Sequence, residues 1–210
     1  MALLQGNQGQ TGKQPGQNLT VGFGETSDLL VTELQARYYQ NNYRGLTFFT
    51  SVASAAPTAY VGAAGGTPLV AVYNPAGSGV NLVVKVVSAA VVAAATAAGQ
   101  TQFRMYGGPT VLPTGVFVNP FSASTLQASG SKARAVNNAA MTSSSALNYI
   151  KTIGTYYWAT AAGAFLEAPI ETDVAGSVLV MPGNIVALGV ASVPTSMTND
   201  ASLFWDEVAI

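Results

Sequence analysis

Carboxylates are the first side chains to consider for acid–base chemistry in this chain, which contains no histidine and no cysteine. Their densest group is Glu167, Glu171 and Asp173 in the stretch EAPIETD. Paired carboxylates can exchange protons with a substrate or hold a hard cation such as calcium. The alternating D-x-D-x-D-G spacing of a calcium loop is absent here, so the pattern favours solvated loop charges.

The missing residue types exclude several classes of enzyme. Nucleophilic catalysis by Ser–His or Cys–His pairs has no histidine to use, and zinc or transition-metal sites lose their usual ligands. Hydrolysis by Glu167, Glu171 or Asp173 alone is the remaining enzymatic alternative, and no supporting pattern accompanies it. We therefore predict a protein that is not an enzyme and that needs no cofactor or metal.

Aromatic residues form two groups, one at Tyr38, Tyr39 and Tyr43 and one over residues 156–158. Aromatic side chains can stack on sugars or nucleobases, and they are also enriched in protein interfaces. The eight Lys and Arg residues are spread along the chain and the net charge is −1, which disfavours nucleic-acid binding. We predict core or interface roles, with an interface formed by Leu30, Leu34, Tyr38, Tyr39, Tyr43, Tyr157 and Trp158.

Low charge points to an assembly. Only 8% of the 210 residues are charged, against about 25% in a typical soluble domain, while 49% are hydrophobic. A surface of small uncharged residues is poorly protected against association. We expect a homo-oligomer.

The elements that must position these residues begin with two N-terminal segments. Residues 1–24 are rich in Gln, Gly and Asn and predict an extended arm that orders against a neighbouring subunit, or a disordered tail. Residues 25–44 predict a helix-like connection, because Leu30, Leu34 and Tyr38 form one apolar stripe at helical spacing. The alternation at Val31, Glu33, Gln35 and Arg37 also permits a strand.

Residues 45–210 predict an all-β sandwich domain. Short apolar or alternating runs are separated by Pro and Gly, as is typical of sandwiches and barrels. The Pro182-Gly183-Asn184 turn between two apolar strands, together with the closing strand SLFWDEV, favours a jelly roll. We expect that closing strand at an edge or an interface, with Trp205 or Phe204 in the core. Asn119–Leu147 predicts a long loop with a short helix near Ser131–Met141.

The Val- and Ala-rich stretch after Asn74 raises the question of a membrane span. Asn81, Lys85 and Ser88 interrupt it, and a spanning helix needs about 20 continuous apolar residues. Its β-branched valines favour a strand. We predict a strand from Val80 to Ala90 that continues or bends into a second one near Val91–Ala95, and no membrane partner.

Three stretches of the chain together resemble tailed-bacteriophage capsid decoration (cement) proteins. They are GETSDLLVTELQARYYQNNYRGLTFFTS, PLVAVYNPAGSGVNLVVKVVS, and MPGNIVALGV with the C-terminal SLFWDEV. The likeness is one of style and order over about a third of the chain. It implies a jelly roll that assembles as a trimer on the capsid exterior and clamps neighbouring major capsid protein subunits, after synthesis in the host cytoplasm. It carries over no catalytic residue.

A carbohydrate-binding or receptor-binding module of a phage head fibre or tail is the alternative. Such a module would be a β-sandwich as well. It would use Tyr and Trp side chains on an exposed face or in the loop Asn119–Leu147, with Trp158 as the residue to test.

Overall fold

The computed structural model describes residues 5–7, 18–20, 39–93, 99–111, 113–128, 130–158, 169–193 and 197–210. The chain divides into two compact units, Met1–Gln40 and Asn41–Ile210. In the first unit β1 (Gln5–Asn7) pairs antiparallel with β2 (Asn18–Thr20). Helix α1 (Tyr39–Tyr43) is the described part of the predicted helix-like connection. Leu30, Leu34 and Tyr38 lie outside the described residues.

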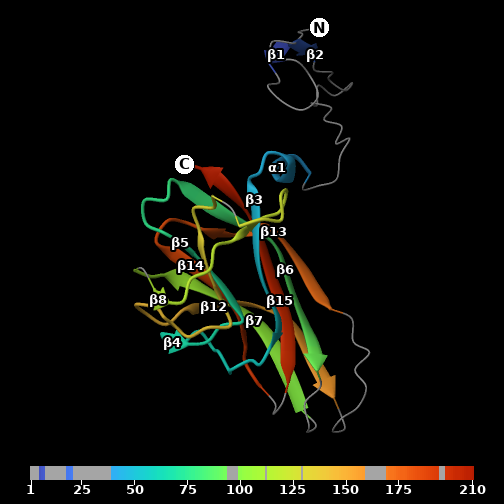
Figure 1. Cartoon of the computed structure of the whole chain (residues 1–210), viewed down its shortest axis with the longest axis vertical. Coiled ribbons are helices and arrows are strands. Elements are labelled where there is room, and N and C mark those ends of the chain that lie inside the picture. The colour runs from blue at the N-terminus through green and yellow to red at the C-terminus, as the bar shows by residue number, and fades with distance from the viewer. Residues whose placement is uncertain are drawn as a thin grey trace, which may run out of the picture. The chain divides into compact units, whose positions relative to one another are not determined.

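The second unit is an all-β sandwich of two five-stranded sheets, as predicted (Figure 1). Sheet I has the order β13-β6-β15-β3-β9, with bounds Ile170–Val180, Val80–Ala93, Thr198–Ala209, Thr47–Ala55 and Phe121–Ser122. Sheet II has the order β10-β5-β14-β7-β12, with bounds Arg134–Asn137, Val70–Asn74, Asn184–Val190, Gly99–Pro109 and Asn148–Trp158. All of these strand pairs are antiparallel.

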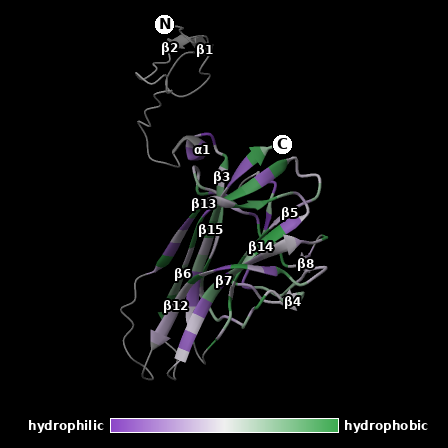
Figure 2. Cartoon of the chain, turned by 180° about the vertical axis from the view of Figure 1, so that it is seen from behind, coloured by the Kyte–Doolittle hydropathy of each residue, from purple (hydrophilic) through white to green (hydrophobic). Residues whose placement is uncertain are grey.

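Alternation along the strands builds the core between the two sheets. Leu203 and Trp205 on β15 point inward from sheet I, and Phe103 and Met105 on β7 point inward from sheet II; all four are fully buried. Figure 2 shows hydrophobic and hydrophilic segments in succession along strands of the second unit. Gly183, with φ of +83°, makes the tight turn that joins β13 to β14.

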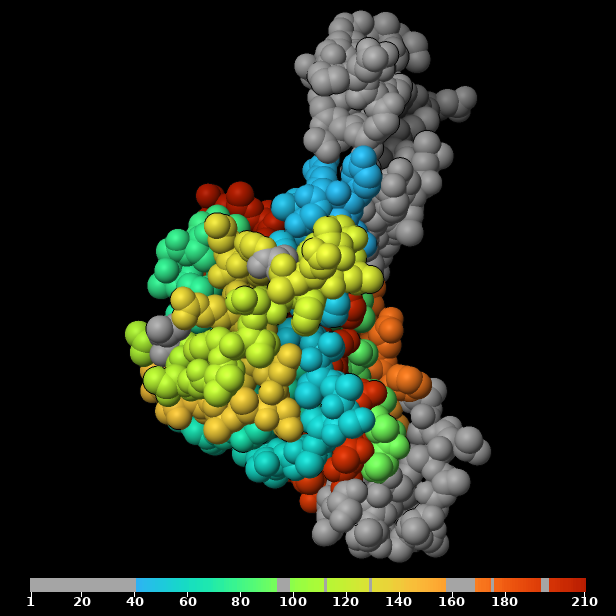
Figure 3. Space-filling view, in the orientation of Figure 1, coloured from blue at the N-terminus to red at the C-terminus, as the bar shows by residue number. Residues whose placement is uncertain are grey.

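A second hydrophobic cluster covers part of the outer side of sheet II. Tyr73, Tyr106 and Ile185 point away from the main core and pack with residues of the connections, such as Tyr60 and Met141. These connections carry a small sheet of β4 (Gly65–Gly66), β11 (Met141–Thr142) and β8 (Thr114–Gly115). In Figure 3 their yellow-green and yellow atoms gather on the left of the view.

The predicted helix near Ser131–Met141 is wrong. Residues Arg134–Asn137 form strand β10, which pairs with β5 at the edge of sheet II. Strand pairing lets Ala135 and Val136 become fully buried on this edge, which an isolated turn of helix would not achieve. The predicted loop Asn119–Leu147 therefore contributes β9, β10 and β11.

The prediction that SLFWDEV lies at an edge is also wrong, while its alternative, an interface, stays a prediction. Strand β15 is central in sheet I, between β6 and β3. The sheet accepts Asp206 and Glu207 there because both carboxylates have close polar partners, described below. Trp205 lies in the core, as expected.

The Val- and Ala-rich stretch forms one long strand, β6, over Val80–Ala93. The prediction of a strand is confirmed, and it continues without a separate second strand as far as Ala93. Residues 94–98 lie outside the described part of the chain. Within the described residues, no helix has both the length and the hydrophobicity to span a bilayer.

Candidate interaction faces

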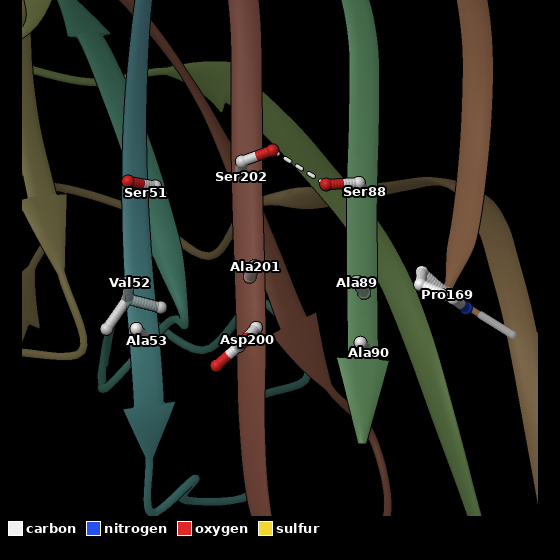
Figure 4. Close-up of a pocket in the computed structure, with 10 residues that line it drawn as sticks. All are labelled: Ser51, Val52, Ala53, Ser88, Ala89, Ala90, Pro169, Asp200, Ala201 and Ser202. Atoms are coloured by element: carbon white, nitrogen blue, oxygen red, sulfur yellow. Dashed lines mark hydrogen bonds between the residues drawn. The ribbon is translucent and has the colours of Figure 1, made fainter. Parts of the chain in front are cut away.

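The outer face of sheet I consists largely of small side chains. Because Leu203 and Trp205 point inward, Ser202 and Phe204 point outward, and Ser202 pairs with Ser51 on one side and Ser88 on the other. Figure 4 shows these three serines at one level across three adjacent strands, with the two hydroxyls of Ser88 and Ser202 2.6 Å apart. They belong to a shallow depression of about 340 Å³, the serine groove, lined by Ser51, Val52, Ala53, Ser88, Ala89, Ala90, Pro169, Asp200, Ala201 and Ser202.

An aromatic stack borders the serine groove on the same face. The Phe49 ring stacks on Phe204 with centroids 5.1 Å apart and on Phe121 with centroids 5.5 Å apart. Phe121 is 38% exposed. The outer face of sheet I is therefore partly apolar, and a partner that covers it would gain from burying these rings.

Carboxylates give this face its charge. Asp200 lies in the serine groove, and its Oδ1 accepts the backbone N–H of Ser54 at 2.7 Å. That bond fixes Ser54, whose φ of +50° is unusual for a residue with a side chain. Glu171 pairs opposite Ser88 and Asp173 opposite Val86, and both are exposed.

Nearer the start of β3, the same face holds a buried ion pair. Lys85 is the extra residue of a bulge in β6, because Val84 pairs with Trp205 while Val86 pairs with Phe204. Its Nζ lies 2.9 Å from Asp206 Oδ1, and the two side chains are only 5% and 8% exposed. Thr47 Oγ1 and Asn41 Nδ2 also donate to this carboxylate, each at 2.6 Å. The cluster fixes the start of β3 and Asn41 of α1 onto the sheet.

Glu207 accepts hydrogen bonds from the turn that precedes β10. Its Oε1 accepts from Ser131 Oγ at 2.6 Å and from the backbone N–H of Lys132 at 3.0 Å, and the N–H of Ala133 lies 3.3 Å away. A carboxylate that accepts several donors from one turn orders that turn. Glu207 therefore positions the segment that leads into β10.

The outer face of sheet II is different over β7 and β12. Arg104 lies next to Gln102, to which it donates through Nη2, and its guanidinium carbon lies 5.9 Å from the centre of the Tyr149 ring. Tyr149 also exchanges a hydrogen bond of 3.0 Å with Thr152, which pairs opposite Arg104. We call Gln102, Arg104, Tyr149, Thr152 and Tyr157 the tyrosine–arginine stripe.

The two tyrosines of this stripe protrude. Tyr149 is 56% exposed and Tyr157 is 64% exposed. Exposed Tyr and Arg side chains are typical of interaction surfaces, because they offer a large apolar area with a polar end.

The predicted interface residues do not form one site among the described residues. Tyr157 belongs to the tyrosine–arginine stripe, and Tyr43 is 64% exposed at the end of α1. Tyr39 and Trp158 belong to α1 and β12, whereas Leu30, Leu34 and Tyr38 lie outside the described residues. Tyr156, next to Tyr157, points into the core.

The predicted acidic group is split in the same way. Glu167 lies outside the described residues, while Glu171 and Asp173 stand two residues apart on β13. In the described part of the chain, no three acidic side chains gather as ligands for a metal ion. Neither the serines of the groove nor Arg104 was singled out from the sequence. Alternation along the predicted strands nevertheless places each of them next to a core residue of its own strand, and therefore on the outward face.

Comparison of the chain with protein-family models, with curated proteins and with solved structures found no match.

Proposed function

We propose that this chain is a structural virion protein, a capsid decoration protein that binds the outer capsid surface and clamps neighbouring major capsid protein subunits. The observation that carries the proposal is a sandwich whose outward sheet faces hold adhesive groups. These are stacked phenylalanines, small hydroxyls and protruding tyrosines.

The order in which the strands pair supports a jelly roll. The eight long strands are β3, β5, β6, β7, β12, β13, β14 and β15. The first pairs with the eighth, the second with the seventh, the third with the sixth and the fourth with the fifth. A long antiparallel ribbon that is rolled up on itself gives this order, and jelly rolls occur in viral capsid proteins and in lectins. A fold does not by itself decide a function, so the faces must do so.

Adhesion is the mechanism that these faces support. A standard interface buries roughly 1,200–2,000 Å². The stacked phenylalanine rings of sheet I lose no hydrogen bond to water when they are covered. A homo-oligomer, which we propose to be a trimer, would repeat each face and bridge several capsid subunits at once.

Co-sedimentation of the purified full chain with empty capsids of its source phage tests the proposal. We expect saturable binding, with capsids that unfold at a higher temperature once the chain is bound. A variant that lacks residues 1–24 should fold but lose this binding, because the arm is the predicted capsid contact. Absence of co-sedimentation at micromolar concentrations would overturn the proposal, and unchanged binding after the deletion would overturn the role of the arm.

Glycan binding is the second candidate, and the tyrosine–arginine stripe favours it. Exposed tyrosine rings beside Arg104 and Gln102 could stack on a sugar and donate to its hydroxyls. A glycan array would decide this. Specific binding that is lost in Tyr157→Ala or in Trp158→Ala, and retained in Tyr43→Ala, would support it.

A further inference from the structure

We propose that the outer face of sheet I in one copy of this chain binds the tyrosine–arginine stripe on sheet II of a second copy. The contact is head-to-tail, because it joins two different surfaces. This inference rests on the part of the proposed function that makes the chain a homo-oligomer, and it does not require capsid binding.

Charges are segregated between the two sheets. The exposed carboxylates of the described strands, Glu171 and Asp173, stand on sheet I, and the partly exposed Asp200 lies beside them in the serine groove. The lysine of sheet I, Lys85, is buried against Asp206. On the outer side of sheet II, Arg104 belongs to the stripe and Arg134 pairs opposite Tyr73 of the outer cluster, whereas Lys151 pairs opposite the inward-pointing Met105. The outer face of sheet I thus carries carboxylates and the outer side of sheet II carries arginines, which favours contact between unlike faces.

Side-chain sizes match as well. The serine groove is lined by Ser, Ala, Val, Pro and a single Asp. The tyrosine–arginine stripe carries large side chains instead, because Tyr149 and Tyr157 are more than half exposed on either side of Arg104. Large rings that enter a groove of small residues exclude water and contact its backbone closely.

Arg104 is suited to reach a carboxylate on a second copy. Its Nη2 donates to Gln102, and the Tyr149 ring holds the guanidinium in place. An arginine held by its neighbours loses little side-chain entropy when it binds a carboxylate such as Asp200 or Glu171.

Symmetric packing of the sheet I face on itself is disfavoured. It would bring Glu171, Asp173 and Asp200 of one copy close to the same residues of the other, and like charges across an interface are repulsive. A head-to-tail contact closes into a ring when its rotation allows and otherwise extends into an open filament.

Cysteine cross-linking tests the geometry, since the chain has no cysteine of its own. Ser51 lies in the serine groove and Thr152 in the stripe, on outward faces of opposite sheets. We expect a short bismaleimide to link Ser51→Cys with Thr152→Cys when the two variants are mixed. Neither variant alone should give cross-linked dimers, and a chain with both substitutions should give a covalent oligomer.

Charge exchange tests the chemistry. Glu171→Lys and Arg104→Glu should each weaken self-association at least about tenfold in sedimentation velocity, and combining them should restore much of it. Asp200→Asn keeps the acceptor for Ser54 and removes only the charge, so it should weaken association without unfolding the groove. Thr114→Lys, on the exposed strand β8, places a lysine away from both surfaces, although it changes the charge by one unit and not two, and it should leave self-association unchanged.

Two outcomes would overturn the inference. One is a monomer in light scattering at micromolar concentration, and the other is cross-linking of a single variant with itself at least as strong as that of the mixture. These assays contain no capsid. If self-association is absent while the chain still co-sediments with capsids, the inference fails and the proposed function stands. A monomer that binds glycans through the stripe would assign that face to the second candidate function instead.

Discussion

Lys85 and Asp206 show how a single buried pair can decide the shape of a face. Both side chains are almost fully covered, and Asp206 accepts from Lys85, Thr47 and Asn41 at once. Taking two charges out of water is costly, and full pairing is what makes it tolerable. The bulge at Lys85 gives that side chain its place on the outer face, so one extra residue in β6 creates the partner that Asp206 needs.

Removing one member of this pair should be strongly destabilising. We expect Asp206→Leu to lower the free energy of unfolding by about 3–5 kcal/mol, because Lys85 would stay buried without its counter-charge. The double variant Lys85→Met with Asp206→Leu should recover most of this loss. Urea unfolding of the parent chain, of each single variant and of the double variant forms a double-mutant cycle, which measures the coupling free energy between Lys85 and Asp206. Additive effects of the two substitutions would contradict the prediction.

Tyr60 should make stability fall at high pH. Burial, followed by the neighbouring Tyr106, raises the pKa of Tyr60 from 10.0 to about 12. The folded chain therefore keeps this proton over a range in which the unfolded chain releases it. The resulting stabilisation is complete below about pH 10 and is lost as the pH rises to about 12, by at most about 3 kcal/mol.

Tyr60→Phe is the matched control for this pH dependence. The Tyr60 hydroxyl is buried without a hydrogen-bond partner in the described structure, so the substitution should cost little at neutral pH. Urea unfolding of both proteins between about pH 8 and pH 12 should show the steeper fall only in the parent chain. Parallel curves would show that Tyr60 does not titrate as expected.

At the scale of elements, strands β5 and β14 of sheet II are covered on both sides. Their inward residues, such as Val72 and Leu188, belong to the main core, while Ala71 and Ala187 belong to the outer cluster. A strand covered on both sides becomes a continuous apolar run and loses its alternation. The ring of Tyr60 lies against Gly189 at the end of β14, which leaves no room for a side chain there.

Gly189→Ala should therefore destabilise the second unit. The added Cβ would lie 2.5 Å from Tyr60 Cδ1 and 2.9 Å from the Tyr60 carbonyl oxygen. Relieving such an overlap typically costs about 1–3 kcal/mol. Gly65→Ala is the control, because nothing lies within 4 Å of its added Cβ. Thermal unfolding should show a lower midpoint only for Gly189→Ala, and equal midpoints would contradict the packing described.

At the scale of the whole molecule, the unequal covering of the two sheets is the main feature of the second unit. Connecting segments pack as a second cluster on part of sheet II, whereas the outer face of sheet I carries the serine groove and the exposed Phe121 ring. Such asymmetry concentrates interaction on particular faces. It also gives a single chain two different surfaces, the outer face of sheet I and the tyrosine–arginine stripe, for the proposed contact between copies.

The unit Asn41–Ile210 should fold without the residues before α1. It contains both hydrophobic clusters and all of the Asp206 partners described above. A chain that begins at Tyr39 should unfold cooperatively in calorimetry, with a midpoint within a few degrees of the full chain, about the shift that 1 kcal/mol produces. Loss of the cooperative transition would show that the N-terminal residues are part of the same folding unit.

The sequence by itself determined the class of the fold, most strands and the chemistry that is excluded. Valine-rich runs and Pro-Gly turns are local signals, so Val80–Ala93 and the turn at Gly183 could be recognised without any partner strand. The absence of His and Cys needs no structure to be read.

Only the tertiary structure decided which strand is central and which residues share a face. Strand β15 carries Asp206 and Glu207, and a local pattern cannot show that Lys85 and the turn before β10 will satisfy them from positions far away in the chain. Likewise, Ser51, Ser88 and Ser202 come from three strands, and only the register of sheet I aligns them. Pairing register is a property of at least two segments, so it is absent from any single stretch of sequence.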